Sequence, residues 1–340
     1  MKIAFVAPPF GQTGGPEITT TQLVDALVEQ GADVTFFAPG DWRTKAKLIP
    51  TIERSLWSMP DFNVQTVQER RNLIVASQVK ILSYQDEFDI IQLNSQRYAY
   101  AVGSNLHVPC VLTLNNRINK KLHSFIKGTG IHTVSFTAKY QNEIGADFYS
   151  KRGIPLDYIK PRFLKGNGLL TVGRITDQKG IHLAIEISKK ANKKLTIVGR
   201  IGDSDERKEY YKEKIKPHID GEQIIHIEKM ENSKVLDFMA GSEALLFPII
   251  RPEAFGRVQL EALACGTPVI GTKVDPLPEI LCDKKVAFLS DDVEEMAWAA
   301  SNTQLFDRLA CREFVEKNRD IRKEAQGYMK IYENILEKSV

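Results

Sequence analysis

The chain has 340 residues, of which 43% are apolar and 26% are charged, and its formal net charge is +3. This length exceeds what one ordinary hydrophobic core organises and indicates two domains, while so small a charge does not support nucleic-acid binding. No run approaches 18 consecutive apolar residues, which excludes a membrane-spanning helix.

The first half of the chain alternates between strand and helix patterns. KIAFVA is a short apolar run typical of a strand buried on both faces, and the apolar spacing over 17–30 predicts a helix. Further strands are expected at 33–39, 89–93, 108–114 and 132–136. This alternation predicts a parallel sheet with helices on both faces.

A second alternating series starts near residue 168. Strands are expected at 168–173, 194–199, 223–227, 244–248 and 267–272, with helices at 180–191 and 257–264. Residues 150–168 lack periodicity and are interpreted as an interdomain linker. We therefore expect an N-terminal Rossmann-like domain at 1–155, a second one at 156–305, and C-terminal helices at 306–340 that pack back across the linker.

Glycine-rich turns should lie at the carboxyl ends of these strands. After the first strand, Gly14 and Gly15 lack the GxGxxG spacing, which disfavours a nicotinamide-dinucleotide site. A glycine pair at a helix start can still bring backbone N–H groups to an anion, or can simply form a turn.

The turn after the strand at 168–173 carries two cations. Gly173 turns the chain, Arg174 follows it, and Lys179 opens the next helix. Arginine can bind two oxygens at once and lysine supplies a mobile charge, so the pair suits a diphosphate leaving group. The alternative is two solvated surface cations.

The frame RPEAFGRVQLEALACGTPVIGT carries two acids eight residues apart. Glu261 sits in an otherwise apolar helix, where a carboxylate needs a hydrogen-bonding partner, and vicinal hydroxyls fit that need. Glu253 precedes the helix and could accept from sugar hydroxyls or be an ordinary helix-start acid. Gly256 lets backbone amides approach a ligand.

This frame resembles the E-x7-E signature of retaining, GT-B-fold glycosyltransferases of family 4, the glycosyl transferases group 1. The resemblance extends over residues 1 to about 285, because other segments follow in that family's order. They are APPFGQTGGPE, GADVTFFAPGD, FDIIQLNS, VPCVLTLNN, LLTVGRITDQKG, KLTIVG and ALLFP. It implies an α/β protein of GT-B architecture, with two doubly wound Rossmann-like domains facing a cleft.

The resemblance also implies an activity. It is the transfer of a sugar from a nucleotide-diphosphate sugar to an acceptor hydroxyl, with retention of configuration and without a cofactor or metal. Glycan, lipid-linked and small-molecule acceptors all fit this class. The implied donor-site roles fall on eight residues. Glu253, with the backbone of Phe255 and Gly256, would bind the sugar, and Glu261 would bind the ribose. Arg174 and Lys179 would bind the diphosphate. Gly14 and Gly15 would form the floor of the site under the phosphates and the acceptor.

Three further positions complete the expected site. Members usually carry a histidine where this chain has Asn115, which can orient a sugar but cannot move a proton. Arg257 would contact phosphate, acceptor or solvent. Gly199 lies in a loop that is expected near the nucleobase of the donor. Asn115 keeps open the alternative of a catalytically weak or inactive nucleotide-sugar-binding protein. A nucleotide-sugar epimerase on the same scaffold is a separate alternative.

Cysteines and termini indicate a cytoplasmic protein. The four cysteines, Cys110, Cys265, Cys282 and Cys311, follow no paired spacing, which favours a reducing compartment. The N-terminal apolar run passes directly into Pro8 and Pro9, unlike a signal peptide. The segment 116–127 combines lysines with apolar residues, so it fits either a peripheral contact with the inner membrane face or an ordinary solvated helix face.

Overall fold

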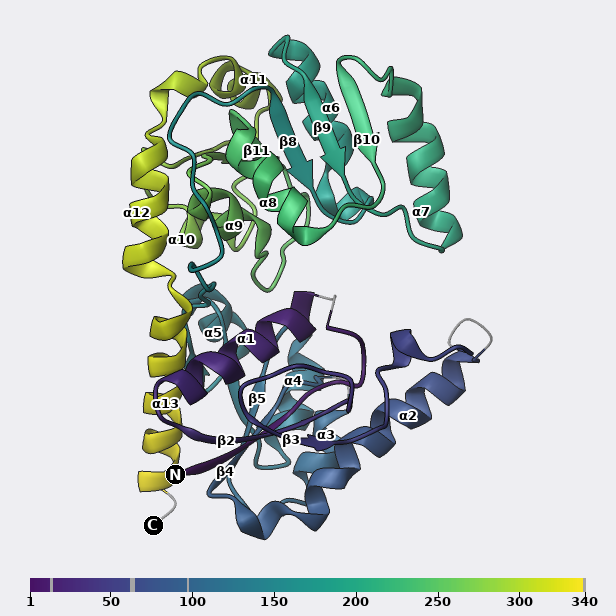
Figure 1. Cartoon of the computed structure of the whole chain (residues 1–340), viewed down its shortest axis with the longest axis vertical. Coiled ribbons are helices and arrows are strands. Elements are labelled where there is room, and N and C mark those ends of the chain that lie inside the picture. Colours follow the sequence, from purple (N-terminus) through teal and green to yellow (C-terminus); the bar gives the residue numbers. More distant parts are fainter. Residues whose placement is uncertain (13–14, 62–64, 97, 339–340) are drawn as a thin grey trace. The chain divides into compact units, whose positions relative to one another are not determined.

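The structure is a computed structural model that describes residues 1–12, 15–61, 65–96 and 98–338. It divides into two compact units. Unit 1 comprises Met1–Ile154 and Ile321–Val340, and unit 2 comprises Pro155–Asp320. The chain therefore passes from one unit to the other twice, after residue 154 and after residue 320 (Figure 1).

In the described part of unit 1, seven strands form one sheet in which every neighbouring pair is parallel. The order is β3-β2-β1-β4-β5-β6-β7. The strands are β1 (Lys2–Val6), β2 (Asp33–Ala38), β3 (Lys47–Pro50), β4 (Ile90–Leu93), β5 (Cys110–Thr113), β6 (His132–Ser135) and β7 (Phe148–Tyr149).

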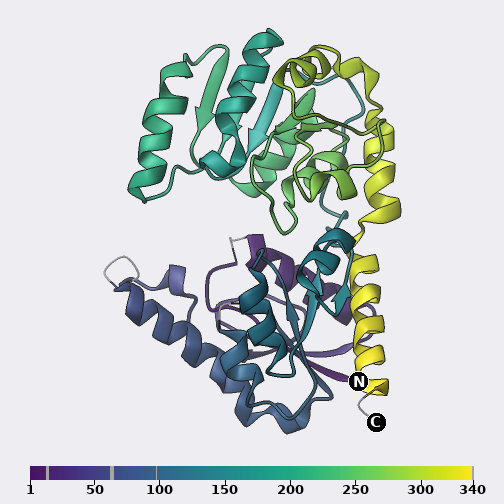
Figure 2. The ribbon, with the colours of Figure 1, turned by 180° about the vertical axis from the view of Figure 1, so that it is seen from behind.

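Helices cover both faces of this sheet. They are α1 (Gly15–Glu29), α2 (Val67–Val79), α3 (Ala99–Gly103), α4 (Lys120–Lys127), α5 (Ala138–Ile144) and α13 (Ile321–Glu337). In β1, Ile3 and Phe5 face the core beneath α1 and α13, whereas Ala4 and Val6 face the opposite core. Figure 1 shows α1 and α13 side by side, and Figure 2 shows the unit from behind.

In the described part of unit 2, six strands form a second parallel sheet, in the order β10-β9-β8-β11-β12-β13. They are β8 (Leu169–Val172), β9 (Leu195–Val198), β10 (Ile224–Ile227), β11 (Ala244–Phe247), β12 (Val269–Gly271) and β13 (Ala287–Leu289). The helices are α6 (Ile181–Lys190), α7 (Asp205–Tyr210), α8 (Asn232–Gly241), α9 (Val258–Ala264), α10 (Leu277–Ile280), α11 (Val293–Ser301) and α12 (Arg308–Asn318).

Both sheets follow the doubly wound order, which confirms the predicted α/β class. The C-terminal segment expected as one helical region splits into α12 in unit 2 and α13 in unit 1. Each sheet reverses its strand order at one place, between β1 and β4 in unit 1 and between β8 and β11 in unit 2. Ligands of open parallel sheets bind beyond the carboxyl ends of the strands at such reversals.

Candidate functional site

Two loops of unit 2 leave the sheet at its reversal point. One follows β8 and carries Lys179, and the other follows β11 and carries Glu253. The backbone joins them, because the N–H of Ile250 donates to the carbonyl of Gln178 over 3.0 Å. The fold thus brings together residues that are 74 positions apart in the chain.

Lys179 and Glu253 form an ion pair. The Nζ atom lies 2.7 Å from Oε1 and 2.9 Å from Oε2 of the carboxylate. Both side chains are largely buried, and Nζ also lies 5.0 Å from the ring centroid of Phe247. Desolvation offsets much of the attraction in such a pair, so the cation and the carboxylate can each exchange the other for a ligand group.

Arg174 supplies a second cation in the same loop. Its neighbours are fixed by backbone bonds, from Gly173 N–H to the Val198 carbonyl over 3.0 Å and from Ile175 N–H to the Arg200 carbonyl over 2.9 Å. The Arg174 side chain is exposed and, within the described part of the chain, has no hydrogen-bonding or ionic partner. It is therefore available to an incoming anion.

Gly256 follows Glu253 in the second loop and adopts φ +83°. A Cβ atom at this position would lie 3.3 Å from the Phe247 ring and 3.4 Å from Oε2 of Glu253. Phe255 is buried, and its carbonyl accepts a 3.1 Å hydrogen bond from Nε2 of Gln259. The positive φ and the short distance to the Phe247 ring both favour glycine at this position.

Glu261 lies in α9 with 8% of its surface exposed, and it has the partner that its burial requires. Nε of Arg257 donates to its Oε1 over 2.8 Å, and Nη2 of Arg257 donates to the hydroxyl of Tyr158 over 3.2 Å. Nη1 is buried and has no hydrogen-bonding partner within the described residues. Arg257 thus contacts a carboxylate and a tyrosine of its own unit, and a contact with phosphate or acceptor stays a prediction.

Gly199 brings a third loop against the first. A Cβ atom on Gly199 would lie 1.8 Å from the carbonyl oxygen of Gly173, so no other residue fits here. Nε2 of His226 lies 2.9 Å from the Gly199 carbonyl, and Nδ1 lies 3.2 Å from the hydroxyl of Tyr211. The loop that is expected near the nucleobase is thus held by a histidine, which a tyrosine contacts in turn.

The residues expected at the reversal point of unit 1 are only partly described. Gly14 lies outside the described residues, and Gly15 starts α1 and is exposed. Asn115 follows β5, and its Oδ1 accepts a 2.9 Å hydrogen bond from Nη2 of Arg152. Sequence reasoning missed Arg152, because it lies in the segment interpreted as a linker.

Glu17, in the first turn of α1, is a buried acid of unit 1. Burial raises its pKa, and a hydrogen bond from its own backbone N–H opposes this rise. Sequence reasoning gave this carboxylate no role. The available signal was its position two residues after the glycine pair, at the start of the predicted helix.

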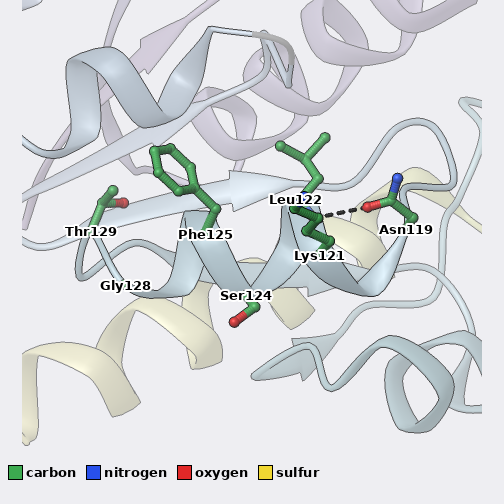
Figure 3. Close-up of a pocket in the computed structure, with 7 residues that line it drawn as sticks. All are labelled: Asn119, Lys121, Leu122, Ser124, Phe125, Gly128 and Thr129. Atoms are coloured by element: carbon green, nitrogen blue, oxygen red, sulfur yellow. Dashed lines mark hydrogen bonds between the residues drawn. The ribbon is translucent and has the colours of Figure 1, made fainter.

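The segment 116–127 contains α4, which Asn119 caps by accepting from the N–H of Leu122 over 2.8 Å. Leu122 and the 59% exposed Phe125 point to one side of the helix, and Ser124 points to the other (Figure 3). The neighbouring cations are partly neutralised, since Arg117 pairs with Glu143 and Lys127 with Asp147. The surface pocket here is lined by Asn119, Lys121, Leu122, Ser124, Phe125, Gly128 and Thr129.

Two kinds of feature are absent from the described residues. No helix there is long and apolar enough to cross a membrane. No group of three or more His, Cys, Asp or Glu side chains among them is arranged to hold a metal ion.

Proteins from several microorganisms are similar to this chain over part or most of its length. An uncharacterized glycosyltransferase of Methanocaldococcus jannaschii is 28% identical over 220 residues, covering 58% of this chain and 60% of the relative. A protein from the cps region of Klebsiella pneumoniae is matched over 46% of its length. The phosphatidyl-myo-inositol mannosyltransferase of Mycolicibacterium smegmatis is 24% identical over 336 residues, covering 88% and 83%.

Solved structures share the whole fold. Sucrose-phosphate synthase from Thermosynechococcus elongatus superposes with a TM-score of 0.79 at 16% identity, covering 99% of this chain and 100% of that one. HepE from Anabaena, solved with UDP and glucose, has a TM-score of 0.74 at 18% identity, covering 98% and 100%. Residues 159–326 match the family model described as glycosyl transferases group 1. The chain therefore belongs to the glycosyl transferases group 1 family and has the GT-B fold.

Proposed function

We propose that this protein is a retaining glycosyltransferase that moves a sugar from a nucleotide-diphosphate sugar to an acceptor hydroxyl. The observation that carries the proposal is the Lys179–Glu253 ion pair at the reversal point of the second sheet. A cation and an acid paired there match a ligand that presents a diphosphate next to a hydroxylated sugar.

Donor binding would replace that pair. Lys179 and Arg174 would turn to the diphosphate, and Glu253, with the backbone of Phe255 and Gly256, would accept the sugar. Glu261, held by Arg257, would accept the ribose hydroxyls. Gly173 and Gly199 would bring the two loops close enough to enclose the nucleotide.

The chemistry would then rest on charge stabilisation. The bond from the anomeric carbon to the phosphate oxygen breaks, and Arg174 and Lys179 stabilise the negative charge that develops on the departing diphosphate. The acceptor hydroxyl attacks the same face of the sugar and passes its proton to the leaving phosphate. Asn115 would orient a sugar without moving a proton.

Support for a uridine donor comes from the solved relatives, since HepE from Anabaena was crystallised with UDP and with UDP-glucose. The matching experiment is a thermal-shift panel of UDP, GDP, ADP, dTDP and their sugar conjugates in the presence of EDTA. A ligand at 100 times its Kd stabilises by about 2.7 kcal/mol, which moves Tm by a few degrees.

The melting temperature of the wild type is expected to rise with the ligands of one nucleobase. The melting temperatures of Lys179→Ala and Glu261→Gln should rise weakly or not at all. Turnover is then followed by ¹H NMR of the anomeric proton of the product, which reports retention directly. Binding without hydrolysis or transfer would favour the inactive-binder alternative. Interconversion of free nucleotide sugars without transfer would favour the epimerase.

A further inference from the structure

Arg152 is fixed by residues from several elements of unit 1. Its guanidinium carbon lies 3.6 Å from the ring centroid of Phe136, and its Nε lies 3.8 Å from Oε1 of Glu324 on α13. Nη1 lies 3.4 Å from Oγ1 of Thr19 on α1. A planar group held on its face and along its edge cannot rotate freely, so its remaining donors have a fixed direction.

That direction determines how the amide of Asn115 is turned. A guanidinium only donates hydrogen bonds, so the Asn115 atom 2.9 Å from Nη2 of Arg152 must be the oxygen Oδ1. The amide nitrogen Nδ2 then points away from Arg152. It is buried and has no hydrogen-bonding partner in the described part of the chain. A buried donor without a partner is unfavourable and indicates a missing acceptor.

The backbone around Asn115 is fixed as well. Its own N–H donates to the carbonyl of Thr113 over 3.0 Å, which forms a tight turn after β5. Gln96, in the loop after β4, donates to the Asn116 carbonyl over 2.7 Å and accepts from the Asn116 N–H over 2.8 Å. The side chain of Asn115 and the peptide that follows it are thus held independently.

A second unsatisfied donor lies on the adjacent strand end. Asn94 directly follows β4, which pairs with β5, and only 7% of its surface is exposed. Its Nδ2 is also buried and has no partner within the described residues. Two amide donors at neighbouring strand ends match a ligand that offers acceptor oxygens, such as the hydroxyl or ring oxygens of a sugar.

We propose that Arg152 is a positioning residue that fixes Asn115 as a hydrogen-bond donor to an oxygen atom of a sugar substrate. The inference rests on the proposed function for the identity of the ligand. An amide cannot move a proton, so its contribution is the orientation of the sugar. Asn94 is the second donor of the same subsite.

The decisive variant is Asn115→Asp, which keeps the shape of the side chain and its contact with Arg152 but removes the donor. We expect kcat for transfer to fall about 100-fold or more, with a Kd for UDP within about threefold of the wild type. The thermal midpoint should not fall, because the new carboxylate pairs with Arg152. Asn105→Asp, on an exposed asparagine of the same unit, is the matched control and should leave kcat unchanged.

Arg152→Lys tests positioning separately from stability. The ¹⁵N-labelled side-chain amide of Asn115, identified by its loss in Asn115→Asp, should shift and exchange faster with water in Arg152→Lys. A purely structural role for Arg152 would lower the thermal midpoint and leave that amide signal in place. The NMR readout requires no turnover.

The outcomes separate the two proposals. If the wild type transfers sugar and Asn115→Asp keeps kcat within about threefold, the donor role of Asn115 is overturned and the proposed function stands. If the wild type transfers nothing from any donor, the proposed function fails. The Asn115 amide signal in Arg152→Lys then decides the positioning claim, and an unchanged signal would overturn it.

Discussion

Tyr332 on the C-terminal helix donates a 3.0 Å hydrogen bond to Oε1 of Gln92, which lies in a central strand of the first sheet. Both side chains are fully buried. Nε2 of Gln92 in turn donates a hydrogen bond to Oγ1 of Thr113 over 3.0 Å. That oxygen lies 2.8 Å from the hydroxyl of Tyr328. Two tyrosines of α13 thus complete a polar network inside the sheet.

Tyr332→Phe should destabilise the protein by about 1–3 kcal/mol, because it leaves the buried Oε1 of Gln92 without a donor. Chemical denaturation followed by circular dichroism measures this loss. The double variant Tyr332→Phe with Gln92→Leu should recover part of it, since Gln92→Leu removes the oxygen that was left without a donor. Equal losses in the single and double variants would contradict the bond's role.

Lys179→Met should reduce kcat about 100- to 1,000-fold, because it removes one group that stabilises the leaving diphosphate and keeps the apolar stem. A coupled assay for nucleotide release gives this value. Lys190→Met is the matched control: Lys190 also pairs with a carboxylate in unit 2, that of Glu294, and its loss should leave kcat within about twofold.

Glu261→Gln should weaken UDP binding, whereas it should leave the binding of 2′,3′-dideoxy-UDP unchanged, because only UDP offers hydroxyls to the carboxylate. Isothermal titration of both ligands with both proteins forms a complete cycle. We expect a loss of about tenfold or more in UDP affinity, the value of one good charge-assisted hydrogen bond. Equal losses for both ligands would place the ribose elsewhere.

Glu17 predicts a pH-dependent stability. Since burial raises its pKa in the folded state, folding favours the protonated form, and the stability falls as the pH rises from the ordinary glutamate pKa through the raised one. Glu17→Gln should therefore be more stable than the wild type at pH 7 and match it at pH values well below the ordinary glutamate pKa. Thermal midpoints measured across that range test the sign.

The α4 surface predicts weak membrane contact. Phe125 is 59% exposed beside Leu122, and Lys120 and Lys121 are exposed at the start of the helix. Vesicles that contain anionic lipid should retain the protein at low salt and release it at high salt, because the attraction is screened. Phe125→Ser should abolish retention. No retention of the wild type at low salt would leave α4 as a solvated face.

Much of the fold was predictable because most central strands are buried on both faces and read as continuous apolar runs. The edge strands β3, β7 and β13 gave no such signal, since each contains exposed or half-buried residues and none is a continuous buried run. The Arg257–Glu261 pair could have been recognised, because the two residues lie four apart at the start of a helix.

Arg152 could not have been identified in the same way. It lies among prolines, glycines and charges, a composition that indicates a linker, and its partners come from positions 19, 115, 136 and 324. Only the tertiary fold brings these positions together. The departure from histidine at Asn115 was visible in the sequence, whereas the group that fixes its amide was not.

The division of the chain also sets an order of assembly during synthesis. Unit 2 is one continuous segment, Pro155–Asp320, inserted within unit 1. The core of unit 1 includes Ile321, Ala325 and Tyr328, which are translated after the whole of unit 2. Because translation runs from the N-terminus, unit 2 can fold as soon as it leaves the ribosome. Unit 1, whose strands are translated first, therefore cannot complete the core that it forms beneath α1 and α13 until unit 2 has been made.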